Sequence, residues 1–318
     1  MHYIETLREG ERVNEIYLCK NKQSALTKAG KPYEALILQD KTGTLDAKIW
    51  EPGSVGIDDF DRFDYINVVG DITSFQGALQ LNVKRVRKAT EGEYEPKEYL
   101  PVSEYNVDEM YEQLLGYIKQ MENPYLKKLA GSFFIEDADF AKRFKLVKFH
   151  SAAKSVHHGF VGGLLEHTLS VTKLSAYFAD NYKILNKDLL VCAAMFHDIG
   201  KLEELSTFPE NDYTDEGQLL GHIMIGAMEI AERIKTIDGF PVKLAHEMEH
   251  CILAHHGELE YGSPKKPALP EAVALSYADN IDAKMETMRE LLANVPEGDT
   301  QWQGFNRLFE SNIRRSSI

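Results

Sequence analysis

Five segments of the C-terminal half place a histidine or an aspartate inside or at the end of an apolar run. Their candidate metal ligands are His167, His197, Asp198, His222, His255, His256 and Asp279. An imidazole on an apolar face has two ring nitrogens to satisfy, and a divalent metal satisfies one while a hydrogen-bond acceptor takes the other. A single such histidine is better explained as a core residue bonded to the backbone. Five segments within 113 residues instead favour a shared metal site.

The adjacent pair His197 and Asp198 is the central element of this set. The carboxylate of Asp198 has two oxygens and could bridge two cations, while the imidazole beside it binds one. Nitrogen and oxygen ligands without thiolate suit Mn, Fe, Co or Zn better than they suit a structural zinc site. The three cysteines are scattered without a CxxC spacing (Cys19, Cys192 and Cys251). They therefore predict neither a disulfide framework nor a thiolate metal site.

The candidate ligands lie on segments with helical periodicity, which begins near Asn106. Asn106 precedes Asp108 and Glu109 as in a capping box, and Asn123-Pro124 is typical of the start of a helix. Further helices are predicted over 162–180, 187–197, 217–235, 242–256 and 270–293. The C-terminal half is therefore expected to be all-α.

The N-terminal part has a different periodicity, because apolar and polar side chains alternate there in short runs. The alternation predicts strands over 12–18, 33–38, 45–50, 65–72 and 79–83. Five short strands in a segment of this length indicate a small barrel or sandwich. The segment from Thr90 to Pro101 combines Gly and Pro with charged residues and has the composition of a linker.

Length and composition fit a globular protein of two domains. The chain has 318 residues, of which 43% are hydrophobic and 27% charged, so disordered and low-complexity classes are excluded. The formal charge is −14, and residues 93–318 carry −13 of it. An acidic surface repels polyphosphate, which weakens the expectation of nucleic-acid binding without excluding it, because the N-terminal part has basic runs such as residues 84–88.

No segment has the character of a membrane span. The longest apolar run, from Leu189 to Phe196, has eight residues, whereas a bilayer requires about 20. The first residues have neither the basic nor the apolar region of a secretory signal. We therefore expect a cytoplasmic protein without a membrane partner.

The ordered set of histidines and aspartates, with the run His197-Asp198-Ile199-Gly200-Lys201 at its centre, resembles the HD-domain superfamily of metal-dependent phosphohydrolases. The N-terminal strands resemble an OB-fold of the nucleic-acid-binding kind. The resemblance rests on residues 27–33 before one strand and on residues 38–48 from the end of that strand onward. Together they resemble the bacterial YhaM-type 3′–5′ exoribonucleases over most of the chain.

This resemblance implies a multidomain α and β protein, in which an N-terminal OB-fold β-barrel precedes an all-α HD-domain helical bundle. The expected ranges are 1–90 for the OB-fold, 91–150 for a linker and connecting helices, 151–295 for the HD domain and 296–318 for a C-terminal tail.

The resemblance also implies roles for individual residues. His167, His197, Asp198 and Asp279 match the core HD ligand set, and His222 with one or both of His255 and His256 matches the additional histidines of members with two metals. Asp198 and Lys201 are the catalytic candidates. Lys201 matches a lysine that points at the substrate phosphate in many HD hydrolases, although a surface lysine at a helix end is an equal alternative. The implied cofactor is a divalent metal, two per site, with Mn preferred and Fe, Co or Mg open.

The implied activity is 3′–5′ hydrolysis of single-stranded RNA to nucleoside 5′-monophosphates, with single-stranded DNA as a further substrate and a homo-oligomer left open. Two cations would activate water and neutralise phosphoryl charge. The OB-fold would grip the polymer by stacking on bases and by tracking the backbone with basic residues. The candidates for this contact are Tyr33, Lys48, Trp50, Phe75 and Lys84, although aromatic residues in strands more often belong to a core.

Three other functions stay open. The chain could be an HD-domain hydrolase of nucleotides or cyclic nucleotides that uses the OB-fold for assembly, a di-iron oxygenase with a similar ligand set, or a catalytically silent RNA-binding protein. The complete ligand set argues against the last of these. His157 and His158 could contact the substrate or could simply belong to a loop.

Overall fold

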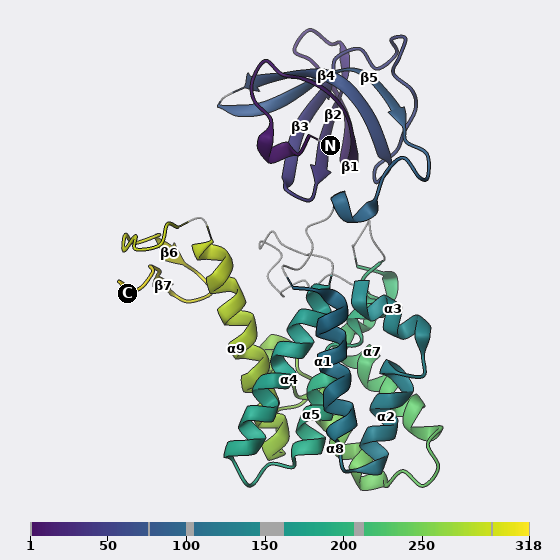
Figure 1. The fold of residues 1–318 in the computed structure, drawn as a ribbon, viewed down its shortest axis with the longest axis vertical. Helices are drawn as coiled ribbons and strands as arrows, with labels where there is room; N and C mark the ends of the chain where they lie inside the picture. Colours follow the sequence, from purple (N-terminus) through teal and green to yellow (C-terminus); the bar gives the residue numbers. More distant parts are fainter. Residues whose placement is uncertain are drawn as a thin grey trace.

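The computed structural model describes residues 2–75, 77–99, 105–146, 162–206, 213–293 and 295–317. An N-terminal β-barrel is followed by a bundle of helices, and a short hairpin ends the chain (Figure 1). The expected fold class, a barrel followed by an all-α unit, is confirmed.

The barrel is made of five strands whose inward-facing residues alternate with outward-facing ones, as the period-2 pattern predicts. The strands are β1 (Arg12–Leu26), β2 (Pro32–Asp40), β3 (Gly43–Ile49), β4 (Tyr65–Phe75) and β5 (Ala78–Lys88). The barrel is closed in the order β1-β2-β3-β5-β4, and only the pair β3–β5 is parallel. Five strands closed in this way form an OB-fold.

All five strands are longer than the sequence pattern predicts, and β1 and β5 are much longer. β1 continues beyond Leu18 because a bulge between Cys19 and Asn21 shifts the alternation by one residue. β5 continues through the basic run of residues 84–88, where only Val86 is buried. Pairing with β4 keeps this charged segment extended.

Two short 3₁₀ helices, one before the first strand and one after the last, pack at the turn between β2 and β3. They are η1 (Ile4–Thr6) and η2 (Pro96–Tyr99). Tyr94, just before η2, stacks on Tyr65 of the barrel with ring centroids 3.8 Å apart, and Tyr99 meets the same ring edge-on at 5.0 Å. The described part of the linker therefore packs on the barrel.

The bundle contains every helix that the apolar periodicity predicts. The helices are α1 (Val107–Gln120), α2 (Pro124–Phe134), α3 (Ala138–Leu146), α4 (Gly163–Asn181), α5 (Lys187–Phe196), α6 (Lys201–Glu204), α7 (Asp215–Lys235), α8 (Val242–Leu253), η3 (Leu259–Tyr261) and α9 (Pro270–Leu292). The side chains of Asn106 and Asn123 cap α1 and α2, as predicted. The prediction for α8 was too long, because the helix ends at Leu253.

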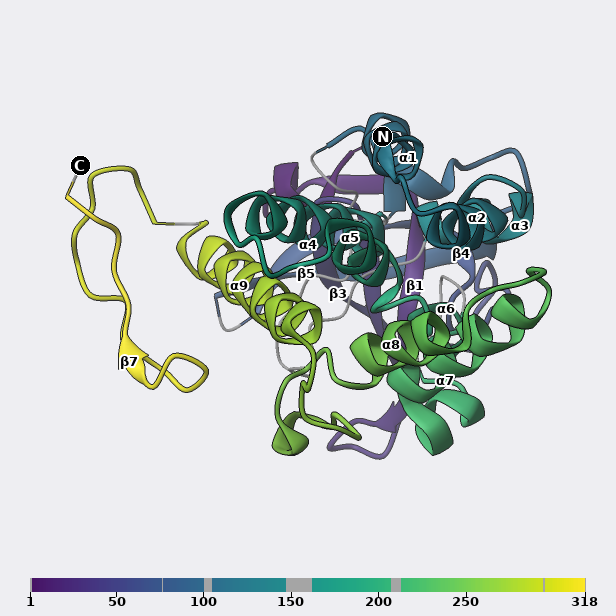
Figure 2. The same cartoon turned by 90° about the horizontal axis from the view of Figure 1, so that it is seen from below.

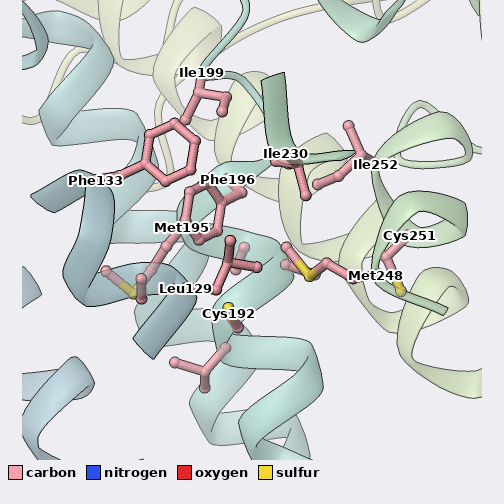
Figure 3. Close-up of a cluster of buried hydrophobic side chains, with 14 of the residues drawn as sticks. Leu129, Phe133, Cys192, Met195, Phe196, Ile199, Ile230, Met248, Cys251 and Ile252 are labelled. Atoms are coloured by element: carbon pink, nitrogen blue, oxygen red, sulfur yellow. The ribbon is translucent and has the colours of Figure 1, made fainter. Parts of the chain in front are cut away.

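α5 is the centre of the bundle. Every residue from Leu189 to Phe196 is buried, because α5 is surrounded by α2, α4, α8 and α9. Figure 3 shows part of this core, in which Phe133 of α2 lies against Phe196 of α5, and Ile252 of α8 lies on the other side of Phe196. The pair His197 and Asp198 thus follows the buried end of α5 directly.

The C-terminal hairpin lies apart from the bundle, beyond the end of α9 (Figure 2). It consists of β6 (Phe305–Asn306) and β7 (Ser311–Asn312). Among the described residues, no helix is both long and apolar enough to cross a membrane. The three cysteines are all buried, and none forms a disulfide.

Candidate metal centre

Five helices bring the predicted ligands together. α5 ends just before His197 and Asp198, and α8 ends just before His255 and His256. The remaining three lie within helices, at His167 of α4, His222 of α7 and Asp279 of α9. All seven candidate ligands therefore lie in one cluster, and they form two groups of three around Asp198.

The first group consists of His167, His197 and Asp279. The Nε2 atoms of the two histidines are 3.0 Å apart, and Asp279 Oδ1 lies 3.2 Å from His167 Nε2. Asp198 turns its Oδ2 atom toward this group, 3.5 Å from His167 Nε2 and 3.4 Å from His197 Nε2.

The second group consists of His222, His255 and His256. Asp198 turns its other oxygen, Oδ1, toward this group, 3.4 Å from His222 Nε2 and 3.7 Å from His255 Nε2. One carboxylate therefore joins two sets of three ligand atoms, with one oxygen for each set.

The outer nitrogen of every histidine in the cluster has a fixed partner. Nδ1 bonds to a backbone carbonyl in three of them: His197 to Ala194, His255 to Ile252 and His256 to Tyr261, at 2.7–2.8 Å. It bonds to a carboxylate in the other two: His167 to Asp282 and His222 to Glu204, at 2.6 and 3.0 Å. Because a carbonyl oxygen only accepts, Nδ1 carries the proton, and Nε2 of a neutral ring presents a lone pair to the cluster.

These inner atoms fit a divalent cation. Nε2 of His167 and Nε2 of His197 face each other at hydrogen-bond distance, and both rings already use Nδ1 outward. Among the described residues, Asp198 Oδ1, His222 Nε2 and His255 Nε2 are buried and have no hydrogen-bond partner. Such groups cost about 1–3 kcal/mol each when left unsatisfied. A cation in each group would supply the missing partner.

The electrostatics of the cluster favour ionised carboxylates. Burial would raise the pKa of Asp198, but Lys201 and His197 hold it well below its usual range. The pKa of Asp279 is likewise lowered, mainly by its hydrogen bond to His167, despite burial. Ionised oxygens are the form that binds metal.

The pKa shifts of three histidines, His167 in the first group and His255 and His256 in the second, have opposite directions. Burial lowers the pKa of His167, but hydrogen bonds to Asp279 and Asp282 outweigh it and raise the pKa to about 9. Burial lowers the pKa of His255, and burial with the neighbouring His255 charge lowers that of His256 to about 4. His255 and His256 therefore favour the neutral imidazole, which is the form that binds a cation.

Lys201 is not a surface lysine, because it is only 8% exposed. Its Nζ atom lies 2.6 Å from Asp198 Oδ2, on the side of the first group. The structure thus places both predicted catalytic residues, Asp198 and Lys201, in direct contact.

The outer carboxylates Asp282 and Glu204 were not predicted from the sequence. Asp282 follows Asp279 by three residues, a spacing that puts both on one face of a helix, so this signal was available. Glu204 stands in the charged run 201–204, where it looks like a solvent-exposed residue. Its burial depends on the tertiary packing of α6 on α7.

Comparison with known proteins agrees with this geometry. The family model of the HD domain matches residues 164–284, which contain all seven candidate ligands. Two proteins named 3′-5′ exoribonuclease YhaM, from Bacillus subtilis (strain 168) and Bacillus licheniformis, are 35% and 36% identical to this chain over 295 and 293 residues. Each alignment covers 91% of this chain and 90% of the relative. The chain belongs to the YhaM 3′-5′ exoribonuclease family.

The barrel of this YhaM family member also has a structural counterpart. It is similar to the second OB-fold domain of replication protein A from Methanococcus maripaludis, at 18% identity, with coverage of 30% of this chain and 98% of that one and a TM-score of 0.23.

The predicted nucleic-acid contacts lie on the outside of the barrel. Tyr33, Lys48 and Trp50 point outward. Side chains of the opposite face of the same strands fill the core, among them Leu36, Ala47 and Ile49. The rings of Tyr33 and Trp50 are 5.2 Å apart, and the Lys48 ammonium lies 5.8 Å from the centre of the Tyr33 ring.

Asn82 extends this outer face onto β5. Its Oδ1 accepts a hydrogen bond from the Trp50 indole at 3.0 Å. Phe75, at the end of β4, is 60% exposed. Lys84 is exposed and forms an ion pair with Asp71. Tyr33, Trp50 and Phe75 therefore lie outside the barrel core, whereas aromatic residues in strands are usually buried. His157 and His158 lie outside the described residues.

Proposed function

We propose that this chain removes nucleotides from the 3′ end of single-stranded RNA by hydrolysis at two divalent cations. The observation that supports this most strongly is the position of Asp198, whose two oxygens face two separate groups of three ligand atoms. The relatives named 3′-5′ exoribonuclease YhaM support the substrate class and the polarity.

His167, His197 and Asp279 would hold the first cation, and His222, His255 and His256 the second, with Asp198 shared. When bound, the two cations lower the pKa of water and neutralise charge on the phosphoryl oxygens. Water attacks the phosphorus of the last phosphodiester, and the bond to the 3′ oxygen of the preceding nucleotide breaks. The products are a nucleoside 5′-monophosphate and an RNA shorter by one residue.

Lys201 has a distinct part in this proposal. Its buried ammonium contacts the Asp198 carboxylate at 2.6 Å, so it keeps that carboxylate ionised and holds a positive charge beside the place of reaction. Asp198 would bridge the cations and Lys201 would contact the phosphate, which makes them the catalytic pair.

The outer face of the barrel, formed by Tyr33, Lys48, Trp50, Phe75 and Lys84, would bind the strand upstream of its 3′ end. Aromatic rings stack on any base, so this contact is tolerant of sequence and accepts single-stranded DNA as well as RNA. A homo-oligomer stays a prediction.

The metal preference follows from the ligands. Five imidazoles favour Mn²⁺, Fe²⁺ or Co²⁺ over the oxygen-preferring Mg²⁺. We expect EDTA to stop hydrolysis and Mn²⁺ to restore it at least as well as Mg²⁺. Full activity with Mg²⁺ alone, without any gain from added Mn²⁺, would contradict the assignment of the histidines.

The test of the proposed function is product analysis on a single-stranded RNA labelled at its 5′ end. The labelled strand should shorten progressively while the label stays on the long fragment, and chromatography should show nucleoside 5′-monophosphates. The Asp198→Asn variant, purified in parallel, is the control for contaminating nucleases. Early release of the label as a mononucleotide, or products with 3′-phosphates, would contradict the proposal.

A further inference from the structure

Each of the two ligand groups contains one histidine that is held by a carboxylate. In the first group this is His167, bonded to Asp282, and in the second it is His222, bonded to Glu204. His197, His255 and His256 are held by backbone carbonyls instead. An outer carboxylate makes the imidazole a stronger donor to a cation than a neutral carbonyl does.

The contact between Glu204 and His222 is closely constrained. Glu204 is 8% exposed, and its Oε1 atom accepts two hydrogen bonds from His222, one from Nδ1 at 3.0 Å and one from the backbone N–H at 2.9 Å. A buried carboxylate is costly unless it is bonded in this way. Both bonds hold the ring in one orientation, with Nε2 toward Asp198.

Three glycines make this contact possible. Gly221 interrupts α7 with φ of 72° and ψ of 155°, a conformation open essentially to glycine alone, and it precedes His222 directly. A Cβ atom on Gly200 would lie 2.0 Å from the carbonyl oxygen of His222, and one on Gly217 would lie 2.2 Å from that of Glu204. The backbones of α6 and α7 can therefore approach only with glycine at these positions.

Asp282 is arranged in a comparable way around His167. Its Oδ2 atom accepts the bond from Nδ1 at 2.6 Å, and its Oδ1 atom accepts a bond from the hydroxyl of Ser170, one turn along α4. Both oxygens are thus occupied, and the carboxylate is fixed against α4.

We propose that Glu204 and Asp282 are positioning residues that set the affinities of the two cation sites separately, Glu204 for the site at His222, His255 and His256, and Asp282 for the site at His167, His197 and Asp279. This inference rests on the proposed two-cation function. Loss of such an outer partner lowers metal affinity by about 10-fold to 100-fold, and each loss should fall on one site only.

The test uses the full chain and measures Mn²⁺ binding by equilibrium dialysis after removal of metal. Glu204→Gln and Asp282→Asn keep an oxygen that can accept the histidine N–H, so they remove charge while the hydrogen bond and the fold remain. Matched controls are Glu203→Gln beside the first residue, which is paired with Arg143, and Glu286→Gln one turn beyond the second, which is paired with Arg289. Thermal melting checks that all variants are folded.

The wild type and both controls should bind two Mn²⁺ ions. Each single variant should bind one as tightly as the wild type and the other about 10-fold to 100-fold more weakly, and the double variant should bind both weakly. Binding of two Mn²⁺ ions with wild-type affinity by Glu204→Gln or by Asp282→Asn would overturn the inference. Binding of one ion with wild-type affinity by the double variant would also overturn it, because both residues would then act on the same site. Fewer than two ions in the wild type would instead overturn the two-cation function itself, and the inference with it.

Discussion

At the scale of single residues, Asp198 is the position on which the proposed chemistry depends most. It is 2% exposed. Among the described residues, only Asp198 directs one carboxylate oxygen toward each of the two ligand groups. We expect Asp198→Ala to lower the rate of RNA hydrolysis by at least about 10³-fold, since even one lost electrostatic contact in an active site costs about 10²–10³. Its metal content should also fall.

The measurement is single-turnover hydrolysis, with metal content from elemental analysis and folding from circular dichroism. Asp137→Ala is a suitable control, because that carboxylate binds Arg233 at 3.0 Å, away from the ligands. Near-wild-type turnover by a folded Asp198→Ala protein would refute a mechanism with two bridged cations.

Glu229 of α7 allows a prediction about stability. Burial, and then the charge of Glu203, raise its pKa from 4.5 to about 7, although Arg143 and Arg233 oppose the shift. The folded protein therefore holds this proton more tightly than the unfolded chain does. Stability from this group is present below pH 4.5 and is lost as the pH rises to about 7.

We expect Glu229→Gln, which resembles the neutral acid, to increase the free energy of unfolding near pH 8. One pKa unit corresponds to about 1.4 kcal/mol, and partial exposure reduces the effect, so the gain should be about 1–2 kcal/mol. It should disappear near pH 4, as measured by urea denaturation. Glu232→Gln, an exposed carboxylate one turn away, should show no such gain. Equal effects at both pH values would contradict the shift.

At the scale of helices and strands, the sequence predicts elements that follow one clear periodicity. α5 was predicted within one residue because its apolar run and its cap Asn186 coincide. The pattern was insufficient where tertiary contacts replace local signals. β5 keeps a charged segment extended by pairing with β4, and α8 ends two residues before His255, close to the left-handed Gly257.

The same limit applies to the candidate site. The candidate ligands and their order could be recognised from the sequence, because they lie in apolar runs and match the HD ligand set. Glu204 could not be recognised from the sequence, because it becomes buried only when α6 packs against α7 at Gly217. A residue that orients a metal ligand by a hydrogen bond from a different helix has no fixed distance in sequence from that ligand, so sequence spacing does not identify it.

The outer face of β2 and β3 carries the prediction at this scale. Trp50 is 47% exposed beside Tyr33, and stacking on a base contributes about 1–3 kcal/mol. Trp50→Ala should therefore raise the dissociation constant for single-stranded RNA by about 5-fold to 150-fold, measured by fluorescence anisotropy at one salt concentration. The chain has two tryptophans, and Trp302, 65% exposed on the C-terminal hairpin, is the matched control. Equal losses in Trp50→Ala and Trp302→Ala would exclude a specific role for this face.

At the scale of the whole molecule, charge and packing divide the chain in the same place. Residues 1–92 carry a formal charge of −1 and residues 93–318 carry −13. The barrel and the bundle also have separate hydrophobic cores with no residue in common. The acidic bundle should attract phosphate only where cations are bound, so grip on a long strand must come from the barrel.

Removal of residues 1–104 tests this division of work. The cut lies beyond Tyr94 and Tyr99, which pack on Tyr65 of the barrel, so that no aromatic residue loses its partner. Loss of two stacked bases costs about 2–6 kcal/mol, or about 30-fold to 10⁴-fold in affinity. Hydrolysis of an RNA of about 20 nucleotides at subsaturating concentration should fall by a factor in this range. A dinucleotide is too short to use the barrel, and its hydrolysis should change little.

Both proteins must be compared at equal metal content and equal salt, because phosphate contacts weaken as salt rises. If both substrates were affected equally, the barrel would serve folding or assembly, and a hydrolase of nucleotides would become the better description of the bundle.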